Sequence, residues 1–192
     1  MILGACGGGP ESVSPPSPPA EPEVAEVAEA AFQTGVVHLV DPLERPDSGE
    51  KAHAEVPRVI ALLNSFYSSA FLDPAKWQGG LHPDLAPLFT AEAQPGAAGN
   101  LTNLAMSDLS DRIESVEPLR QTLDKVTFLV AEDGSVPIGV ASVTFEATGK
   151  PAGDGPDVTI THTGHYWLQR EGDEYKISAF EVSMNAAEGP DR

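Results

Sequence analysis

Basic residues, cysteines and long apolar runs are all scarce in this sequence of 192 residues. Its 11 lysines and arginines stand against 29 acidic residues, and the formal net charge of -18 argues against binding to nucleic acid or to anionic lipid surfaces. The single cysteine excludes an intrachain disulfide and a metal centre built from several cysteines. No apolar run approaches the roughly 20 residues that cross a bilayer. Hydrophobic residues make up 41% of the chain, enough for one ordinary domain.

Motifs for nucleotide binding and for hydrolysis are missing as well. The sequence contains no P-loop, no G-x-S-x-G, and no G-x-G-x-x-G that opens a helix after a strand. His162 and His165 stand three residues apart within a predicted strand, so their side chains point to opposite faces and cannot share a metal ion. We therefore expect no metal site, no cofactor and no catalytic residue.

The only cysteine ends the segment Leu3-Gly4-Ala5-Cys6, which resembles the lipobox of bacterial lipoproteins. In that family a signal peptidase cuts before the cysteine, whose sulfur carries a diacylglycerol. Only five residues precede Cys6, too few for the basic and apolar regions of a signal peptide, so either the start codon is assigned too late or the N-terminus has been trimmed. The resemblance implies lipidation at Cys6 and anchoring to the outer leaflet of the bacterial plasma membrane. The alternative is an ordinary cysteine in a soluble protein.

The segment that follows Cys6 is rich in proline and glutamate. Residues 7–31 contain no basic residue, and such a composition cannot bury enough apolar surface to offset the entropy lost on ordering. Prolines keep part of it extended, and the glutamates repel one another. We expect residues 1–32 to comprise the truncated lipobox and a disordered tether, and residues 185–192 to form a disordered tail.

A connecting segment, residues 33–55, leads into the predicted helices; within it, residues 36–40 could form either a strand or a poorly marked helix. Residues 56–72 form the clearest helix, because apolar side chains recur at the i, i+3, i+4, i+7 spacing and Pro57 fits the first turn. Shorter helices are predicted at 74–77, at 83–93, where Gln94-Pro95-Gly96 ends the helix, and at 101–109.

From residue 113 onward the apolar period changes to two, which is typical of strands. Five strands are predicted, at 113–118, 121–131, 136–148, 157–170 and 174–184. Helices followed by a meander of strands indicate an α+β domain over residues 56–184, with the helices on one face of an antiparallel sheet. Phe128 is predicted on one face, and Leu123 and Leu129 on the other. Either the outer face meets a partner or the sheet curls around its helices.

The order of these elements, together with His165-Tyr166-Trp167-Leu168-Gln169-Arg170, Tyr175-Lys176-Ile177 and Phe180-Glu181-Val182, resembles the nuclear-transport-factor-2-like superfamily, which includes SnoaL-like and ketosteroid-isomerase-like proteins. The resemblance covers about residues 56–184. It implies a cone, in which N-terminal helices pack on a strongly curved antiparallel sheet around a pocket. The abundance of Ala, Gly, Pro and Asp also resembles the secreted lipoproteins of actinobacteria, in which similar domains occur.

Enzymes of that superfamily place an acid or base inside the pocket, where burial raises the pKa of a carboxylic acid. Candidates for this role are few here. Tyr67 could donate a hydrogen bond from the main helix, and His165 could act as a base. The remaining candidates fall at helix–loop junctions or near strand ends: Asp73, Asp108, Glu146 and Glu181.

The aromatic side chains of the helices and strands are the expected lining of the pocket: Phe66, Tyr67, Trp77, Phe128, Phe145, Tyr166, Trp167 and Phe180. Whether Tyr166 or Trp167 points inward depends on the position of a β-bulge. We expect a non-catalytic domain in the cell envelope that binds a partner protein or a small apolar ligand, and a homodimer through the outer sheet face. The alternative is a pocket enzyme of isomerase or dehydratase type on the same fold.

Overall fold

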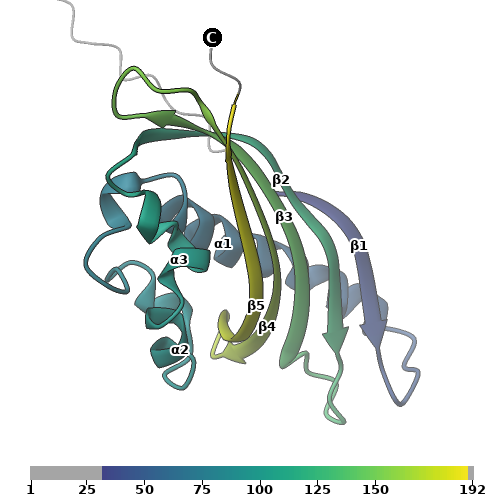
Figure 1. Ribbon diagram of the computed structural model, residues 1–192. Helices are drawn as coiled ribbons and strands as arrows, with labels where there is room; N and C mark the ends of the chain where they lie inside the picture. Colours follow the sequence, from purple (N-terminus) through teal and green to yellow (C-terminus); the bar gives the residue numbers. More distant parts are fainter. Residues whose placement is uncertain (1–31, 190–192) are drawn as a thin grey trace, which may run out of the picture.

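One five-stranded sheet and one long helix dominate the part of the chain that the computed structural model describes, residues 32–189 (Figure 1). The strands lie side by side in chain order: β1 (Gln33–Val40), β2 (Ile113–Leu129), β3 (Ile138–Pro151), β4 (Val158–Glu171) and β5 (Glu174–Glu188). β1 is parallel to β2, and every other neighbouring pair is antiparallel. The domain is therefore α+β, as predicted, on an open sheet of mixed direction.

β1 corrects the prediction of a wholly antiparallel sheet. The ambiguous residues 36–40 belong to a strand that extends the sheet beyond β2, so part of the segment expected to be a connection belongs to the sheet. The crossover from β1 to β2 spans residues 41–112 and contains every described helix. Two parallel neighbouring strands need a long connection of this kind. The local pattern of apolar residues does not show which strand will pair with β1 after such a connection.

β2 joins the predicted strands 113–118 and 121–131 into one strand. The pairing with β3 shifts register between Pro118 and Arg120 and again between Leu123 and Lys125, so bulges absorb the interruption. The second shift turns Leu123 to the inner face, where it is fully buried, while Leu129 stays outside. The prediction that Leu123 lies on the outer face is therefore wrong. At the other end of the sheet, β5 continues to Glu188, four residues beyond the predicted strand.

α1 (Ser48–Ala70) starts eight residues before the predicted helix and carries Pro57 in its interior, not in its first turn. The proline ring removes one backbone hydrogen bond from the helix. Pro57 lies on the exposed side of α1, where its ring meets solvent and not the core.

A carboxylate that lies before α1 accepts hydrogen bonds at the start of the helix. Asp41 accepts hydrogen bonds from the side chains of Arg45, at 2.9 Å, and Ser48. These bonds hold the pKa of Asp41 far below its usual range. Arg45 also donates to the carbonyl oxygen of Ala131, at 2.7 Å, in the turn between β2 and β3. This link between the start of α1 and a distant turn stabilises the first turns of the helix, which lie before the predicted start at residue 56.

Five short helices connect α1 to β2: η1 (Pro74–Lys76), η2 (Ala86–Leu88), α2 (Gln94–Ala98), α3 (Leu101–Ala105) and η3 (Ser107–Leu109). α2 begins at Gln94-Pro95-Gly96, where a helix end is predicted, because proline is as well suited to the first turn of a helix as to a break. Met106, the residue after α3, is buried and has a left-handed φ of 48°, which ends the helix.

The helices cover one face of the sheet, and the inward side chains of the strands meet them in one apolar core (Figure 1). On β4 the even-numbered residues from Val158 to Leu168 are buried, while the odd-numbered ones face away from the helices. The opposite face of the sheet, termed the outer face below, carries no described helix.

Candidate functional site

Most of the aromatic residues predicted to line a pocket are core residues. Six of the eight expose at most 1% of their surface: Phe66, Tyr67, Trp77, Phe128, Phe145 and Tyr166. Trp167 points from the outer face and is 38% exposed, whereas Phe180 is partly buried, its ring centre 5.9 Å from that of Phe89. Strand alternation thus places Tyr166 inside and Trp167 outside.

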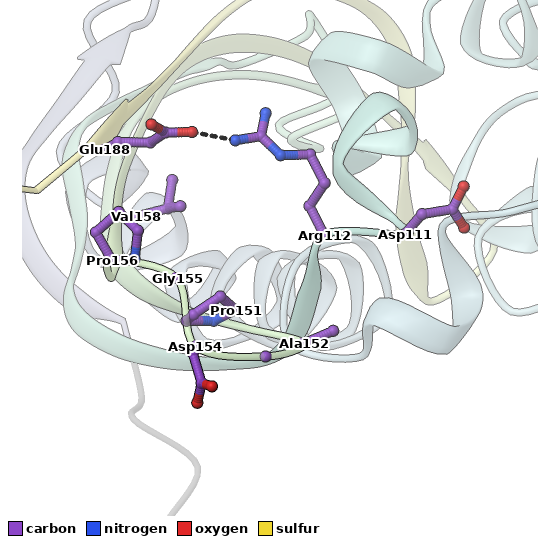
Figure 2. A pocket seen from close by; sticks show the side chains of 10 residues that line it. Asp111, Arg112, Pro151, Ala152, Asp154, Gly155, Pro156, Val158 and Glu188 are labelled. Atoms are coloured by element: carbon purple, nitrogen blue, oxygen red, sulfur yellow. Dashed lines mark hydrogen bonds and ion pairs between the residues drawn. The ribbon is translucent and has the colours of Figure 1, made fainter.

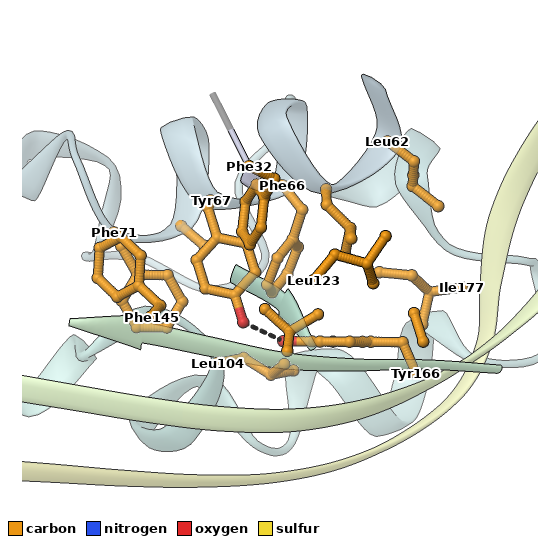
Figure 3. Close-up of a cluster of buried hydrophobic side chains, with 14 of the residues drawn as sticks. Phe32, Leu62, Phe66, Tyr67, Phe71, Leu104, Leu123, Phe145, Tyr166 and Ile177 are labelled. Atoms are coloured by element: carbon orange, nitrogen blue, oxygen red, sulfur yellow. Dashed lines mark hydrogen bonds between the residues drawn. The ribbon is translucent and has the colours of Figure 1, made fainter. Parts of the chain in front are cut away.

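Aromatic rings from α1, β3 and β4 fill the space between the helix and the sheet (Figure 3). Phe66 meets Tyr67 and Tyr166 edge to face, with ring centres 5.1 and 5.5 Å apart. Phe71 stacks on Tyr67 and tilts against Phe145, each at 5.1 Å. These are normal contact distances for aromatic pairs. The chain's own side chains therefore occupy this interior.

Three polar side chains meet within the aromatic cluster. The Tyr67 hydroxyl lies 2.9 Å from His162 Nδ1 and 3.1 Å from the Tyr166 hydroxyl. Tyr67 comes from α1, and His162 and Tyr166 lie four residues apart on the inner face of β4, on either side of Gly164. Because Gly164 has no side chain, the Tyr166 ring can lie along the strand over it and reach Tyr67. The sequence pattern indicates both tyrosines as candidates to line a pocket, whereas nothing in it points to a role for His162.

Burial keeps all three groups neutral. Desolvation lowers the pKa of His162 to about 3, although the nearby Asn103 backbone favours the charged form. Burial also raises the pKa of Tyr67 and of Tyr166 well above the usual value for a tyrosine. Among residues 32–189, His162 Nε2 and Trp77 Nε1 have no hydrogen-bond partner. The cluster could pass a proton between neutral groups, but none of its three members is a carboxylic acid and all three are fully buried.

We expect the protein to lose stability as the pH falls from 6.5, because His162 is neutral when folded and takes up a proton when unfolded. The His162 contribution is complete above pH 6.5 and is lost as the pH approaches about 3, at about 1.4 kcal/mol per pH unit. Urea unfolding at pH 7 and pH 5 measures this difference. His162→Gln should lack it, and an equal loss in the wild type and the variant would contradict the assignment.

The other acid–base candidates lie away from this cluster. Asp73 accepts a hydrogen bond from the Ala75 backbone at the start of η1, and Asp108 is exposed. Glu146 and Glu181 lie on the outer face. His165 also lies there, 2.9 Å from the Ser142 hydroxyl, which confirms that His162 and His165 face opposite sides. Within residues 32–189 no group of three or more metal-ligating side chains comes together.

Two surface pockets lie elsewhere, and the predicted lining residues contribute to neither. One, of about 290 Å³, lies beside the loop between β3 and β4, with Arg112 and Glu188 paired across it (Figure 2). The other, of about 300 Å³, lies between α1, η2 and the turn before β5, and includes Arg58, Leu62 and Leu88. Both are open hollows of mixed polarity.

A buried carboxylate beside the second pocket was not anticipated. Glu55 is 7% exposed and accepts hydrogen bonds from Arg58, at 2.9 Å, and Arg170, at 3.0 Å. It joins α1 to the end of β4. The sequence does hold a signal for its burial: Glu55 lies three residues after Ala52 and four before Val59, on the apolar stripe of α1. The pairing with Arg170 depends on the tertiary fold and gives the buried carboxylate a partner of opposite charge.

Large apolar side chains are exposed on the outer face toward one end of the sheet. Val36 and Val40 on β1, Leu129 on β2, Ile138 on β3 and Trp167 on β4 each expose between 38% and 55% of their surface. The opposite end of the same face carries threonines, among them Thr144, Thr161 and Thr163. Exposed apolar groups in a cluster are typical of a surface that binds a partner.

No protein-family model and no curated protein matches this chain. Cys6 and the proposed tether lie outside the described residues, so lipidation and disorder there stay predictions. No helix within residues 32–189 is long and apolar enough to cross a membrane.

Proposed function

We propose that this protein is a bacterial envelope lipoprotein, held at the outer leaflet of the plasma membrane through Cys6, whose domain binds another protein and catalyses no reaction. The nuclear-transport-factor-2-like identity of the fold belongs to the same proposal; its support is the long helix packed against a five-stranded sheet. The observation that carries the binding role is the contrast between an interior filled by aromatic rings and a Trp167 that stands exposed on the outer face.

A filled interior predicts that apolar small molecules do not bind there. Thermal unfolding in the presence of a panel of apolar ligands tests this, because a ligand at 100 times its dissociation constant stabilises a protein by about 2.7 kcal/mol. We expect no stabilisation, and native mass spectrometry of the protein purified from its host should show no bound molecule. A ligand that raises the melting temperature would instead support a small-molecule role.

Lipidation predicts that Cys6→Ala moves the protein from the membrane fraction to the soluble fraction. The gene is expressed in a bacterium with its upstream region, and a fatty-acid probe follows the modification. Two or three acyl chains are expected, since a single chain gives only marginal binding. Ser12→Ala, in the same tail, should leave both labelling and partition unchanged. A wild-type protein that is unlabelled and soluble would overturn the anchor.

A pocket enzyme of isomerase or dehydratase type is the second candidate, and the contact between Tyr67, His162 and Tyr166 is the observation that favours it. Tyr67→Phe separates the two functions, because it removes only the hydroxyl. For a binding protein we expect a loss of stability of about 2–3 kcal/mol in urea unfolding, because the hydroxyl contacts both His162 and Tyr166 and its removal leaves buried polar groups unpaired. For an enzyme, the loss of a donor in the site would slow turnover about 10²- to 10³-fold.

A further inference from the structure

The two edges of the sheet differ in what lies beside them. At the β5 edge, the Thr90 N–H donates to the Ile177 carbonyl at 3.0 Å, where the segment after η2 runs alongside the strand. At the β1 edge, no described segment pairs with the strand (Figure 1). Within residues 32–189, the backbone of residues 33–39 forms hydrogen bonds with β2 alone. β1 is therefore an open edge.

Alternate backbone groups of β1 point away from the sheet. The Val40 carbonyl accepts a hydrogen bond from the Val130 N–H at 3.0 Å, so the backbone of Val40 faces β2. In a strand this direction alternates from one residue to the next. The N–H and C=O groups that face away from β2 are therefore those of Gly35, Val37 and Leu39. Backbone groups in such a row are satisfied together by another extended backbone.

The sequence of β1 contains no feature that would prevent such pairing. Residues 33–40 read QTGVVHLV, with no lysine and no proline, and their pairing with β2 shows no register shift. Charges, prolines and bulges are the usual means by which sheet edges avoid other strands. Val36 and Val40 are about half exposed on the outer face, and Val37 and Leu39 are only partly buried on the inner face. A strand added here would cover apolar side chains on both faces.

The surroundings of β1 indicate which side chains a partner strand needs. On the outer face Val40 lies in register with Leu129 and Ile138, and this exposed apolar row ends at β1. An apolar side chain on an added strand would continue the row. The net charge of -18 favours basic residues on either side of the apolar positions, because opposite charge speeds association and disfavours acidic partners.

We propose that an extended segment of another protein pairs with the open edge of β1 and adds a sixth strand to the sheet. Apolar residues at alternate positions of this segment lie beside Val36 and Val40, and basic residues flank them. The inference rests on the partner-binding role proposed above, and states how the partner is held. The row of unpaired backbone groups carries it, because an exposed apolar surface by itself does not require a strand.

Hydrogen exchange of the full chain in reductant, followed by NMR, tests the proposal at single residues. In the free protein the amides of Val37 and Leu39 should exchange freely. Those of His38 and Val40 should be protected by their bonds to β2. The probe is the capped peptide KVTVTVK, which has alternating valines and basic ends. Saturating peptide should slow exchange at Val37 and Leu39 at least about tenfold.

Two variants of one residue separate edge pairing from other modes of binding. Val37→Lys places a charge where an added strand would bury it, while the open edge lets the ammonium reach solvent in the free protein. It should raise the dissociation constant of the peptide at least about tenfold. Val37→Pro removes the N–H itself without breaking a bond to β2, is tolerated on edge strands, and should weaken binding to a similar extent.

Leu119→Lys is the matched control for Val37→Lys. It replaces an apolar residue by the same charge at a site on β2 that is 67% exposed and lies outside the pairing with β1. The dissociation constant of the peptide should stay within about threefold of the wild-type value. A Leu119→Lys loss as large as that of Val37→Lys would show that charge alone weakens binding, and would overturn the proposal.

Amides of Val37 and Leu39 that are already protected in the dilute free protein would also overturn it, because the edge would then be covered by this chain or by a second copy. The same holds if millimolar peptide leaves their exchange unchanged, or if neither variant of Val37 weakens binding. Photo-crosslinking residues at positions 37 and 167, used in the native host, keep the proposed function separate. Adducts with another protein at position 167 alone leave partner binding in place but overturn the edge, and no adduct at either position counts against both.

Discussion

Gly164→Ala is expected to lower the free energy of unfolding by about 3 kcal/mol, an unusually large loss for the addition of one methyl group. A Cβ at this position would lie 2.6 Å from Cε2 and 2.9 Å from the hydroxyl oxygen of Tyr166. The ring cannot swing away freely, because Phe66 packs against it with ring centres 5.5 Å apart. Displacing it would also break the contact with the Tyr67 hydroxyl, which leaves buried polar groups unpaired.

Gly153→Ala is the matched control for this change. A Cβ at Gly153 would meet nothing within 4 Å, so this variant should keep its stability within about 0.5 kcal/mol or gain slightly. Chemical denaturation of both variants at neutral pH measures the difference. Adding Tyr166→Leu to Gly164→Ala should cost less than the sum of the two single changes, because the clash is then absent. Additive losses would show that the Tyr166 ring is not the source of the effect.

Phe66→Ala is expected to destabilise the protein by about 3–5 kcal/mol, as is usual when a fully enclosed aromatic ring is removed. Phe66 is 0% exposed and lies at the centre of the aromatic cluster, in edge-to-face contact with Tyr67, Phe89 and Tyr166. These rings belong to α1, to β4 and to the segment after η2, and cannot all move in to close the space. Most of the cavity would therefore remain.

The size of this loss also tests whether the interior is filled. If Phe66 lined an open pocket, its removal would create little new cavity. The free energy of unfolding would then fall by clearly less than 3 kcal/mol. Leu119→Ala is the control for loss of an apolar side chain, since Leu119 is 67% exposed and should change stability by no more than about 0.5 kcal/mol. Urea unfolding gives both values. A Phe66→Ala loss as small as that of Leu119→Ala would contradict the packed core.

Alternation along single strands was readable from the sequence, and it placed several side chains correctly. The period of two over β4 separates His162 from His165 on opposite faces, because successive side chains of a strand must alternate. The same parity makes Tyr166 an inner residue and Trp167 an outer one, because the bulge beside Trp167 places its extra residue, Ser178, in β5 and leaves β4 regular. The position of a bulge depends on how β4 pairs with β5, so no single strand could reveal it.

The candidate site could be predicted only in part, for a similar reason. Phe66 and Tyr67 follow from the apolar stripe of α1, but nothing local connects Tyr67 with His162, 95 residues away. Periodicity identifies a residue as buried; it does not say whether its neighbours enclose a cavity or fill it. The six aromatics are buried, and around Tyr67 the space between helix and sheet is occupied by aromatic rings in contact with one another.

By itself the sequence determined the α+β class, the order of one long helix before a run of strands, and the inward or outward direction of most strand residues, because these depend on local periodicity and propensity. Only the tertiary structure decided that β1 joins β2 in parallel, that Pro57 lies within α1, and that Glu55 is held by Arg170. Each of these depends on contacts between segments far apart in the chain. The free energy of these long-range contacts outweighs local preferences of about 1–3 kcal/mol. The contacts cannot be predicted from a short stretch of sequence, because their partners lie elsewhere in the chain.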